Sequence, residues 1–121
     1  MNEIKIKPDI NELYKLNEFI SENIPNFDFK LELMVEEIFV NIVKYSSCSD
    51  ITVTIDKDDK IQFIDNGIEF NPLEHESSDP PQSIDEANIG GVGIVFIKEI
   101  ADEITYEYTD NKNHLTIRNV K

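Results

Sequence analysis

The chain has 121 residues, 40% hydrophobic and 30% charged, which is enough for one domain with a buried core and is not the composition of a disordered protein. It carries 25 acidic and 11 basic residues, a formal net charge of −14. Because nucleic acids and anionic membranes both attract basic surfaces, this balance argues against binding to either and favours a protein partner with basic residues.

The cysteine content and the first residues favour a cytoplasmic protein. Cys48 is the only cysteine, so no internal disulfide is possible and the sequence suits a reducing compartment. The start, MNEIKIKPDI, is too charged for a signal peptide, and no apolar run approaches the roughly 20 residues of a membrane span. We expect a monomer or a homodimer.

The first half of the chain predicts one strand and two helices. Residues 3–7 alternate polar and apolar side chains, as a strand does. Asp9 is a suitable N-cap for a helix with apolar residues at helical spacing from Ile10 to Ile20. After a break at residues 25–26, a longer helix is predicted from Phe29 to Tyr45, with a buried stripe of Leu31, Met34, Val35, Ile38, Phe39, Ile42 and Val43.

The second half begins and ends with a hairpin. Alternating residues predict strands at 51–55 and 61–64, joined by a turn at 56–59. The last hairpin is expected to set Ile104, Tyr106 and Tyr108 against Leu115 and Ile117 across a turn at 110–113.

Between the hairpins, residues 71–89 show no periodicity and a helix is predicted from Val92 to Ala101. A loop as long as 71–89 inside a small domain is usually functional. The order of elements predicts a single domain, 1–121, of the α+β class. It is expected to be a two-layer sandwich whose mixed, mostly antiparallel sheet has helices on one face.

One polar motif lies on the long predicted helix. Glu37, Asn41 and Lys44 are spaced i, i+4 and i+7, so they share one face beside the apolar stripe. An Asn carbonyl there can bind Mg²⁺, and a carboxylate one turn away can deprotonate or orient a hydroxyl. Alone, the segment also fits an ordinary amphipathic helix.

A second motif follows the strand at 61–64. Asp65 can accept a hydrogen bond from an exocyclic amine such as that of adenine, and Gly67 lets the backbone approach a ring. The same residues also fit a plain turn that ends a strand.

A third motif is the glycine-rich run Gly90-Gly91-Val92-Gly93 before a predicted helix. Such a run exposes backbone N–H groups to phosphates, and the helix dipole favours their charge. It lacks the Gly-Lys-Ser/Thr ending of a P-loop and does not follow a strand as a dinucleotide-binding motif does.

In this order, Glu-x-x-x-Asn on a helix, Asp-x-Gly-x-x-Phe-x-Pro after a strand and Gly-Gly-x-Gly before a helix resemble the GHKL (Bergerat-fold) ATPase superfamily. Within it, the chain looks most like the stand-alone anti-sigma-factor serine/threonine kinases of bacterial partner-switching systems. Residues 90–93, residues 100–103 and the Tyr-rich hairpin ending Leu115-Thr116-Ile117 are similar to the C-terminal half of those kinases. The resemblance covers nearly the whole chain.

The resemblance implies a Mg-ATP site and a role for each matching residue. Glu37 would be the catalytic base, and Asn41 would hold Mg²⁺ against the phosphates. Asp65 would accept from the adenine amine, with Gly67 beside it. Residues 71–89 would form a lid, and the backbone of Gly91, Val92 and Gly93 would contact the phosphates. The partners would be a sigma factor and an antagonist protein whose serine receives the γ-phosphate, and a homodimer would fit the family.

The sequence departs from the resemblance in its positive charge. The expected lid has no Lys or Arg, and the only arginine, Arg118, lies in the last predicted strand, which leaves Lys44 and Lys98 to supply charge near the phosphates. A non-catalytic nucleotide-binding switch module is therefore an alternative to a kinase. A fold that has lost the nucleotide and a catalytic fragment of a histidine kinase are two further readings.

Overall fold

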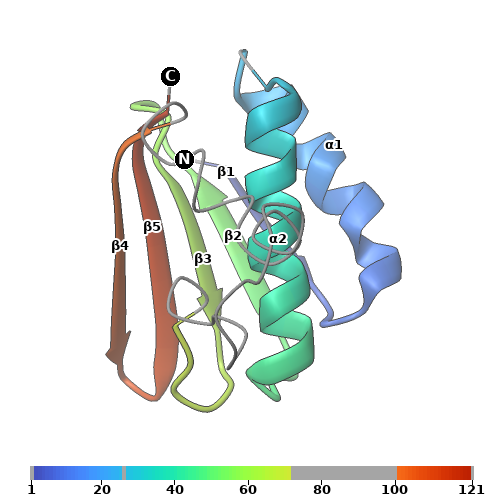
Figure 1. Cartoon of the computed structure of the whole chain (residues 1–121), viewed down its shortest axis with the longest axis vertical. Coiled ribbons are helices and arrows are strands. Elements are labelled where there is room, and N and C mark those ends of the chain that lie inside the picture. Colours follow the sequence, from blue (N-terminus) through green and yellow to red (C-terminus); the bar gives the residue numbers. More distant parts are fainter. Residues whose placement is uncertain (1, 26, 72–100, 121) are drawn as a thin grey trace, which may run out of the picture.

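Two helices cover one face of a five-stranded sheet in the computed structural model, which describes residues 2–25, 27–71 and 101–120 (Figure 1). In chain order the elements are β1 (Asn2–Ile6), the 3-10 turn η1 (Ile10–Glu12), α1 (Leu13–Asn23), α2 (Phe29–Tyr45), β2 (Ile51–Ile55), β3 (Ile61–Asp65), β4 (Ala101–Thr109) and β5 (Lys112–Val120). This arrangement is the α+β sandwich that the sequence predicts.

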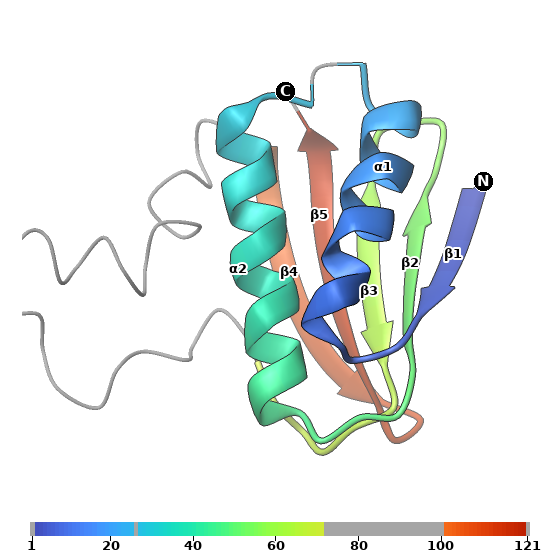
Figure 2. The ribbon, with the colours of Figure 1, turned by 90° about the vertical axis from the view of Figure 1, so that its right-hand side faces the viewer.

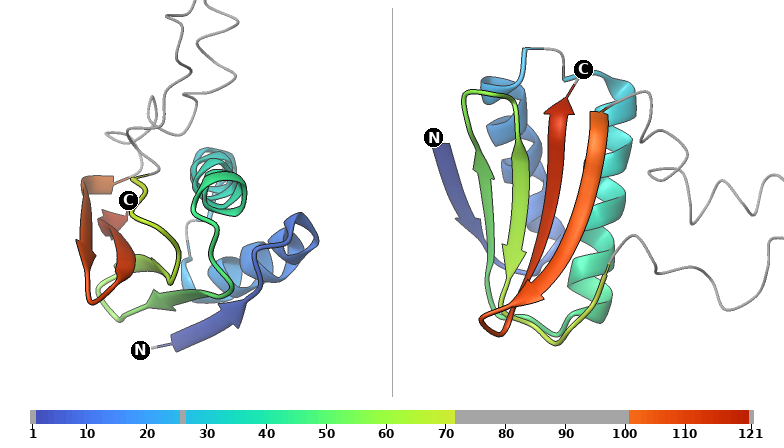
Figure 3. Two further views of the ribbon diagram at one scale, coloured as in Figure 1. Left: turned by 90° about the horizontal axis from the view of Figure 1, so that it is seen from below. Right: turned by 90° about the vertical axis from the view of Figure 1, so that its left-hand side faces the viewer.

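The strands are ordered β1-β2-β3-β5-β4, and all four neighbouring pairs are antiparallel (Figure 3). The last strand of the chain therefore lies between β3 and β4. The register sets Val53, Phe63 and Leu115 side by side on the face covered by the helices. It also sets Asp65 opposite Asn113, at the point where β3 ends and β5 begins.

The long helix α2 follows its predicted boundaries and apolar stripe. Its N-cap is Asp28, whose carboxylate accepts a hydrogen bond from the backbone N–H of Leu31 at 2.9 Å. The stripe is buried, with Met34 and Phe39 1% and 0% exposed, and Val43 at its margin is half-buried. The buried residues of α2 belong to one core cluster with the inner face of the sheet, so α2 is fixed in place by the core.

The shorter helix α1 begins later than its N-cap signal suggests. The Asp9 side chain accepts from the Asn11 N–H, which starts the 3-10 turn η1, and α1 follows from Leu13. Leu16 and Ile20 are fully buried beneath it, and both helices lie over the same face of the sheet (Figure 2). No helix within the described ranges is long and apolar enough to cross a membrane.

Two sequence-based boundaries need correction at the end of the chain. Ala101 was expected to end a helix, but it is the first residue of strand β4. The turn expected at 110–113 is shorter, because β4 ends at Thr109 and β5 begins at Lys112. Asn113 is consequently a strand residue whose side chain faces the interior, and this placement matters for the site below.

Candidate functional site

A buried carboxylate lies at the carboxyl end of β3. Asp65 is 3% exposed, and its Oδ1 accepts hydrogen bonds from the Gly67 N–H and from the Asn113 side-chain amide, both at 2.9 Å. Burial raises the pKa of Asp65, while the Asn113 amide, the Gly67 N–H and the nearby Ser46 side chain oppose the rise because they favour the charged form. Both N–H groups bind the same carboxylate oxygen, and among the described residues no geometric hydrogen bond reaches Oδ2.

The turn after Asp65 packs directly against the end of α2. A Cβ atom placed on Gly67 would lie 2.1 Å from the backbone oxygen of Ser46, so only glycine fits there. The same Ser46 oxygen accepts a hydrogen bond from the Ile68 N–H at 2.7 Å. Glycine is therefore required here because the Ser46 backbone lies too close for a side chain. The sequence suggested a close approach at Gly67 to a ring, and the structure shows one to the protein's own backbone.

A second set of hydrogen bonds fastens this turn to the segment that follows α2. The Asn66 side-chain oxygen accepts from the backbone N–H groups of Ser49 and Asp50, at 2.9 and 3.1 Å. The Asn66 amide in turn donates to the Ser49 hydroxyl at 2.8 Å. The position of Asp65 relative to α2 is thus set by several bonds that do not depend on a ligand.

Asn113 is a site residue that sequence reasoning missed. It is 2% exposed, and its amide donates to Asp65 and to the Ile68 carbonyl oxygen, the latter at 2.7 Å. Its side-chain oxygen accepts from the Phe70 N–H at 2.8 Å and from the Tyr106 hydroxyl. No local pattern marks Asn113, because its partners come from β3, β4 and the turn after β3.

Aromatic side chains lie beside this carboxylate. The rings of Tyr45, at the end of α2, and Phe70 are in tilted contact with centroids 5.6 Å apart. Tyr45 is 41% exposed, and Ile68 in the neighbouring turn is 60% exposed. An exposed aromatic and apolar surface next to a buried acceptor suits a flat heterocycle that carries an amine.

The polar row predicted on α2 leads away from this end of the sheet. Asn41 is only 8% exposed, Glu37 is half-buried and Lys44 is exposed. Within the described ranges, no hydrogen bond engages the Asn41 side-chain amide. With a rise of about 1.5 Å per residue, Asn41 and Glu37 lie about 8 and 14 Å along the helix axis from Ser46. The row thus extends from the Asp65 end in the direction an elongated ligand would follow.

Comparison with protein families identifies the chain. The model of the histidine kinase-like ATPase domain matches residues 15–119. The chain belongs to this family. Among curated proteins, none matches the sequence significantly. Histidine kinase-like ATPase domains of the GHKL type bind ATP, generally with Mg²⁺.

Several residues predicted for this ATPase domain lie outside the described residues. They are Gly91, Val92 and Gly93, the predicted lid except Asn71, and Lys98. Their roles therefore stay predictions. The described part of the site comprises the ends of α2, β3 and β5, the turn after β3, and the side chain of Tyr106 from β4.

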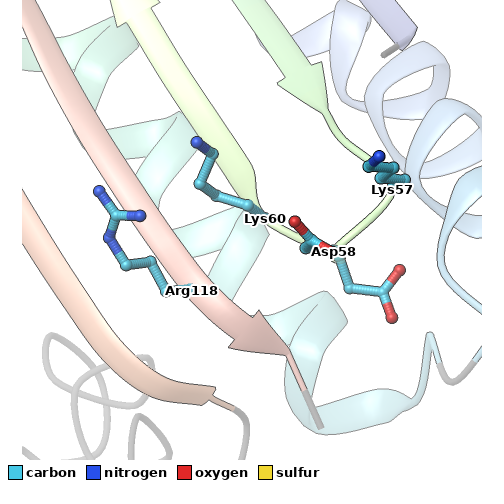
Figure 4. A pocket seen from close by; sticks show the side chains of 5 residues that line it. Lys57, Asp58, Lys60 and Arg118 are labelled. Carbon is cyan, nitrogen blue, oxygen red and sulfur yellow. The ribbon is translucent and has the colours of Figure 1, made fainter.

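A separate hollow of about 440 Å³ lies at the opposite end of the sheet from Asp65. Its lining is Lys57, Asp58, Asp59, Lys60 and Arg118 (Figure 4). The lining contains charges of both signs, and two of its cations form ion pairs: Lys60 pairs with Asp56 at 3.4 Å and Arg118 with Glu103 at 3.3 Å. Among its described lining residues there is no buried carboxylate like Asp65.

Proposed function

We propose that this histidine kinase-like ATPase domain binds Mg-ATP with the adenine at Asp65 and the phosphates along α2. The observation that carries the proposal is the buried Asp65 carboxylate, whose Oδ1 accepts from two N–H donors and whose Oδ2 would accept from an exocyclic amine. Tyr45 and Ile68 supply exposed apolar surface for the ring. The polar face of α2 continues from there towards Asn41 and Glu37.

The residues of α2 fit Mg²⁺ held together with phosphates. Mg²⁺ prefers oxygen ligands and is usually bound through one or two protein side chains plus water and substrate phosphates. Asn41 offers an amide oxygen, and its mostly buried side chain has no hydrogen bond within the described ranges. Asn41 would hold the ion, which when bound neutralises charge on the phosphates, and Lys44 would add positive charge from the exposed side of the same face.

The proposed reaction is phosphoryl transfer to a serine of a protein partner. The serine oxygen forms a bond to the γ-phosphorus, the bond from that phosphorus to the β–γ bridging oxygen breaks, and ADP leaves. Glu37 takes the hydroxyl proton. Phosphoryl transfer depends mainly on positioning and charge neutralisation. Glu37 as the base and Asn41 as the metal ligand would therefore be the principal protein groups, and both lie on α2.

The regulatory role that fits the sequence is that of an anti-sigma-factor kinase. The resemblance in residues 90–93, in residues 100–103 and in the last hairpin supports it. The partners would be a sigma factor, which the protein sequesters, and an antagonist protein that carries the serine. The formal charge of −14 favours partners with basic contact surfaces.

The absence of Lys and Arg from residues 71–89 supports one alternative, a non-catalytic module that changes partner with the bound nucleotide. The two functions share the ATP site and differ in turnover. Transfer of label from γ-labelled ATP to a serine of a partner protein separates them, because only the kinase gives a labelled partner.

The binding site is tested by calorimetric titration of ATP, with and without Mg²⁺. Wild type should bind ATP, Asp65→Asn should lose at least about tenfold in affinity, and Asn41→Ala should lose the dependence on Mg²⁺. Absence of ATP binding to the wild type would refute the nucleotide site.

The catalytic role is tested with two adjacent glutamates on α2 that are both half-buried. Glu37→Gln should abolish label transfer while keeping ATP binding, because the proton acceptor is lost and the shape is retained. Glu36→Gln is the matched control and should transfer label normally. Equal transfer by both variants would exclude Glu37 as the base.

A further inference from the structure

The Asn113 side chain has its full set of hydrogen bonds. An amide side chain has two N–H donors and an oxygen with two lone pairs. In Asn113 the N–H groups reach Asp65 at 2.9 Å and the Ile68 oxygen at 2.7 Å. The oxygen accepts from the Phe70 N–H at 2.8 Å and from the Tyr106 hydroxyl. All four bonds are satisfied, so the amide has one favoured orientation.

The orientation is decided by groups that do not belong to the ligand. A backbone N–H can only donate, so Phe70 requires the Asn113 oxygen on its side. Tyr106 adds a second donor on that side. Burial raises the pKa of Tyr106, so its hydroxyl is protonated and available as a donor at neutral pH. The Asn113 N–H groups are thereby directed at Asp65.

Tyr106 on β4 contacts Asn113 diagonally on the neighbouring strand β5. Its direct neighbour on β5 is Leu115, and Asn113 lies two residues earlier on the same face. Tyr108 is the residue directly opposite Asn113, and it is half-buried on the same face of β4. The two tyrosines are therefore similar in setting, but the hydrogen bond to Asn113 comes from Tyr106.

We propose that Tyr106 is a positioning residue that sets the base selectivity of the nucleotide site by holding the Asn113 amide with its N–H groups toward Asp65. This inference rests on the proposed ATP site. An N–H donor on Oδ1 favours the ionised carboxylate, which can only accept hydrogen bonds. An ionised Asp65 accepts from the 6-amino group of adenine and rejects a 6-oxo group, which is itself an acceptor.

Loss of the Tyr106 hydroxyl removes one of the two donors that define the amide orientation. The Phe70 N–H and the Ile68 oxygen still hold the amide in the same sense but less firmly, so its N–H bond to Asp65 weakens and the protonated carboxyl is favoured. A protonated Asp65 donates a hydrogen bond and tolerates a 6-oxo purine. Discrimination between the two bases should fall, whereas a general loss of structure would weaken both nucleotides alike.

The test measures the dissociation constants of ATP and inosine triphosphate, which carries a 6-oxo group in place of the amine. Wild type should prefer ATP by at least about tenfold. Tyr106→Phe should reduce that ratio by about fivefold, the loss expected for one neutral hydrogen bond. Tyr108→Phe is the matched control and should keep the wild-type ratio. Urea unfolding of each variant reports any change in stability separately.

A second variant protects the test against misfolding of Tyr106→Phe. Asn113→Asp has nearly the same shape and still accepts from Phe70 and Tyr106, but it loses both N–H donors, so Asp65 and the new carboxyl share one proton. Its preference for ATP should also fall. An unchanged ratio in both variants, with ATP still bound, would overturn the inference and leave the ATP site standing. No ATP binding to the wild type would instead overturn the proposed function and the inference with it.

Discussion

Replacement of Gly67 by alanine tests how closely the turn after β3 must approach α2. The added Cβ would lie 2.1 Å from the Ser46 backbone oxygen and 2.8 Å from its carbonyl carbon, whereas ordinary contacts begin near 3.4 Å. The turn must therefore retreat by more than about 1 Å. The nearest atoms belong to the backbone at the end of a packed helix, so they cannot move aside as a flexible side chain would.

The cost follows from two contributions. Overpacking of a filled site typically costs about 1–3 kcal/mol. Retreat of the turn also breaks the 2.7 Å hydrogen bond from the Ile68 N–H to Ser46, a net loss of about 1 kcal/mol. We expect Gly67→Ala to lower the free energy of unfolding by about 2–4 kcal/mol. ATP affinity should fall at least about tenfold, because the Gly67 N–H that binds Asp65 moves with the turn.

Urea unfolding followed by circular dichroism measures the first effect, and calorimetry measures the second. Ile68→Ala is the control for stability: its side chain is 60% exposed and its N–H is retained, so the change should stay within about 0.5 kcal/mol. Combining Gly67→Ala with Ser46→Gly should not restore stability, because the closest contact is with the main chain. Wild-type stability and affinity in Gly67→Ala would refute the close approach.

Three further predictions concern charge, helix capping and thiol reactivity. Asp65→Asn should raise stability at neutral pH while reducing ATP binding. The pKa of Asp65 is raised in the folded state, so wild-type stability falls as the pH rises from the unfolded pKa of about 3.9 through the folded pKa. The urea midpoint of the wild type should therefore decline relative to that of Asp65→Asn over this range. A wild-type midpoint that rises relative to the variant would contradict the prediction. Asp28→Ala should cost about 1 kcal/mol, because the bond to the Leu31 N–H is lost; an unchanged urea midpoint would refute the cap. Burial raises the pKa of Cys48, so iodoacetamide should alkylate it severalfold more slowly at pH 8 than a free cysteine, and equal rates would show that the thiol is exposed.

Local sequence patterns determined the elements that carry the predicted nucleotide-binding residues. The 3.6-residue period of apolar side chains predicted α2 with its boundaries. Asp28, a short polar residue directly before the helix, is its N-cap. Alternation predicted β2 and β3, and Asp65 and Gly67 could be marked as a motif because they lie where the second of these strands ends. These features depend on residues within a few positions of one another, so they can be predicted from the sequence of one chain.

Only the tertiary structure decided which distant residues surround Asp65. Chain order does not reveal that β5 lies between β3 and β4, and this placement brings Asn113 opposite Asp65, 48 residues away in the sequence. Tyr106 was predicted as part of the buried face of a strand, and its hydroxyl acquires a role only because the register of β4 and β5 sets it beside Asn113. Gly67 was interpreted as letting the backbone approach a ring, and only the structure shows that it also allows close contact with the Ser46 carbonyl. Hydrogen bonds between strands depend on strand order and register, which are fixed when the whole core packs.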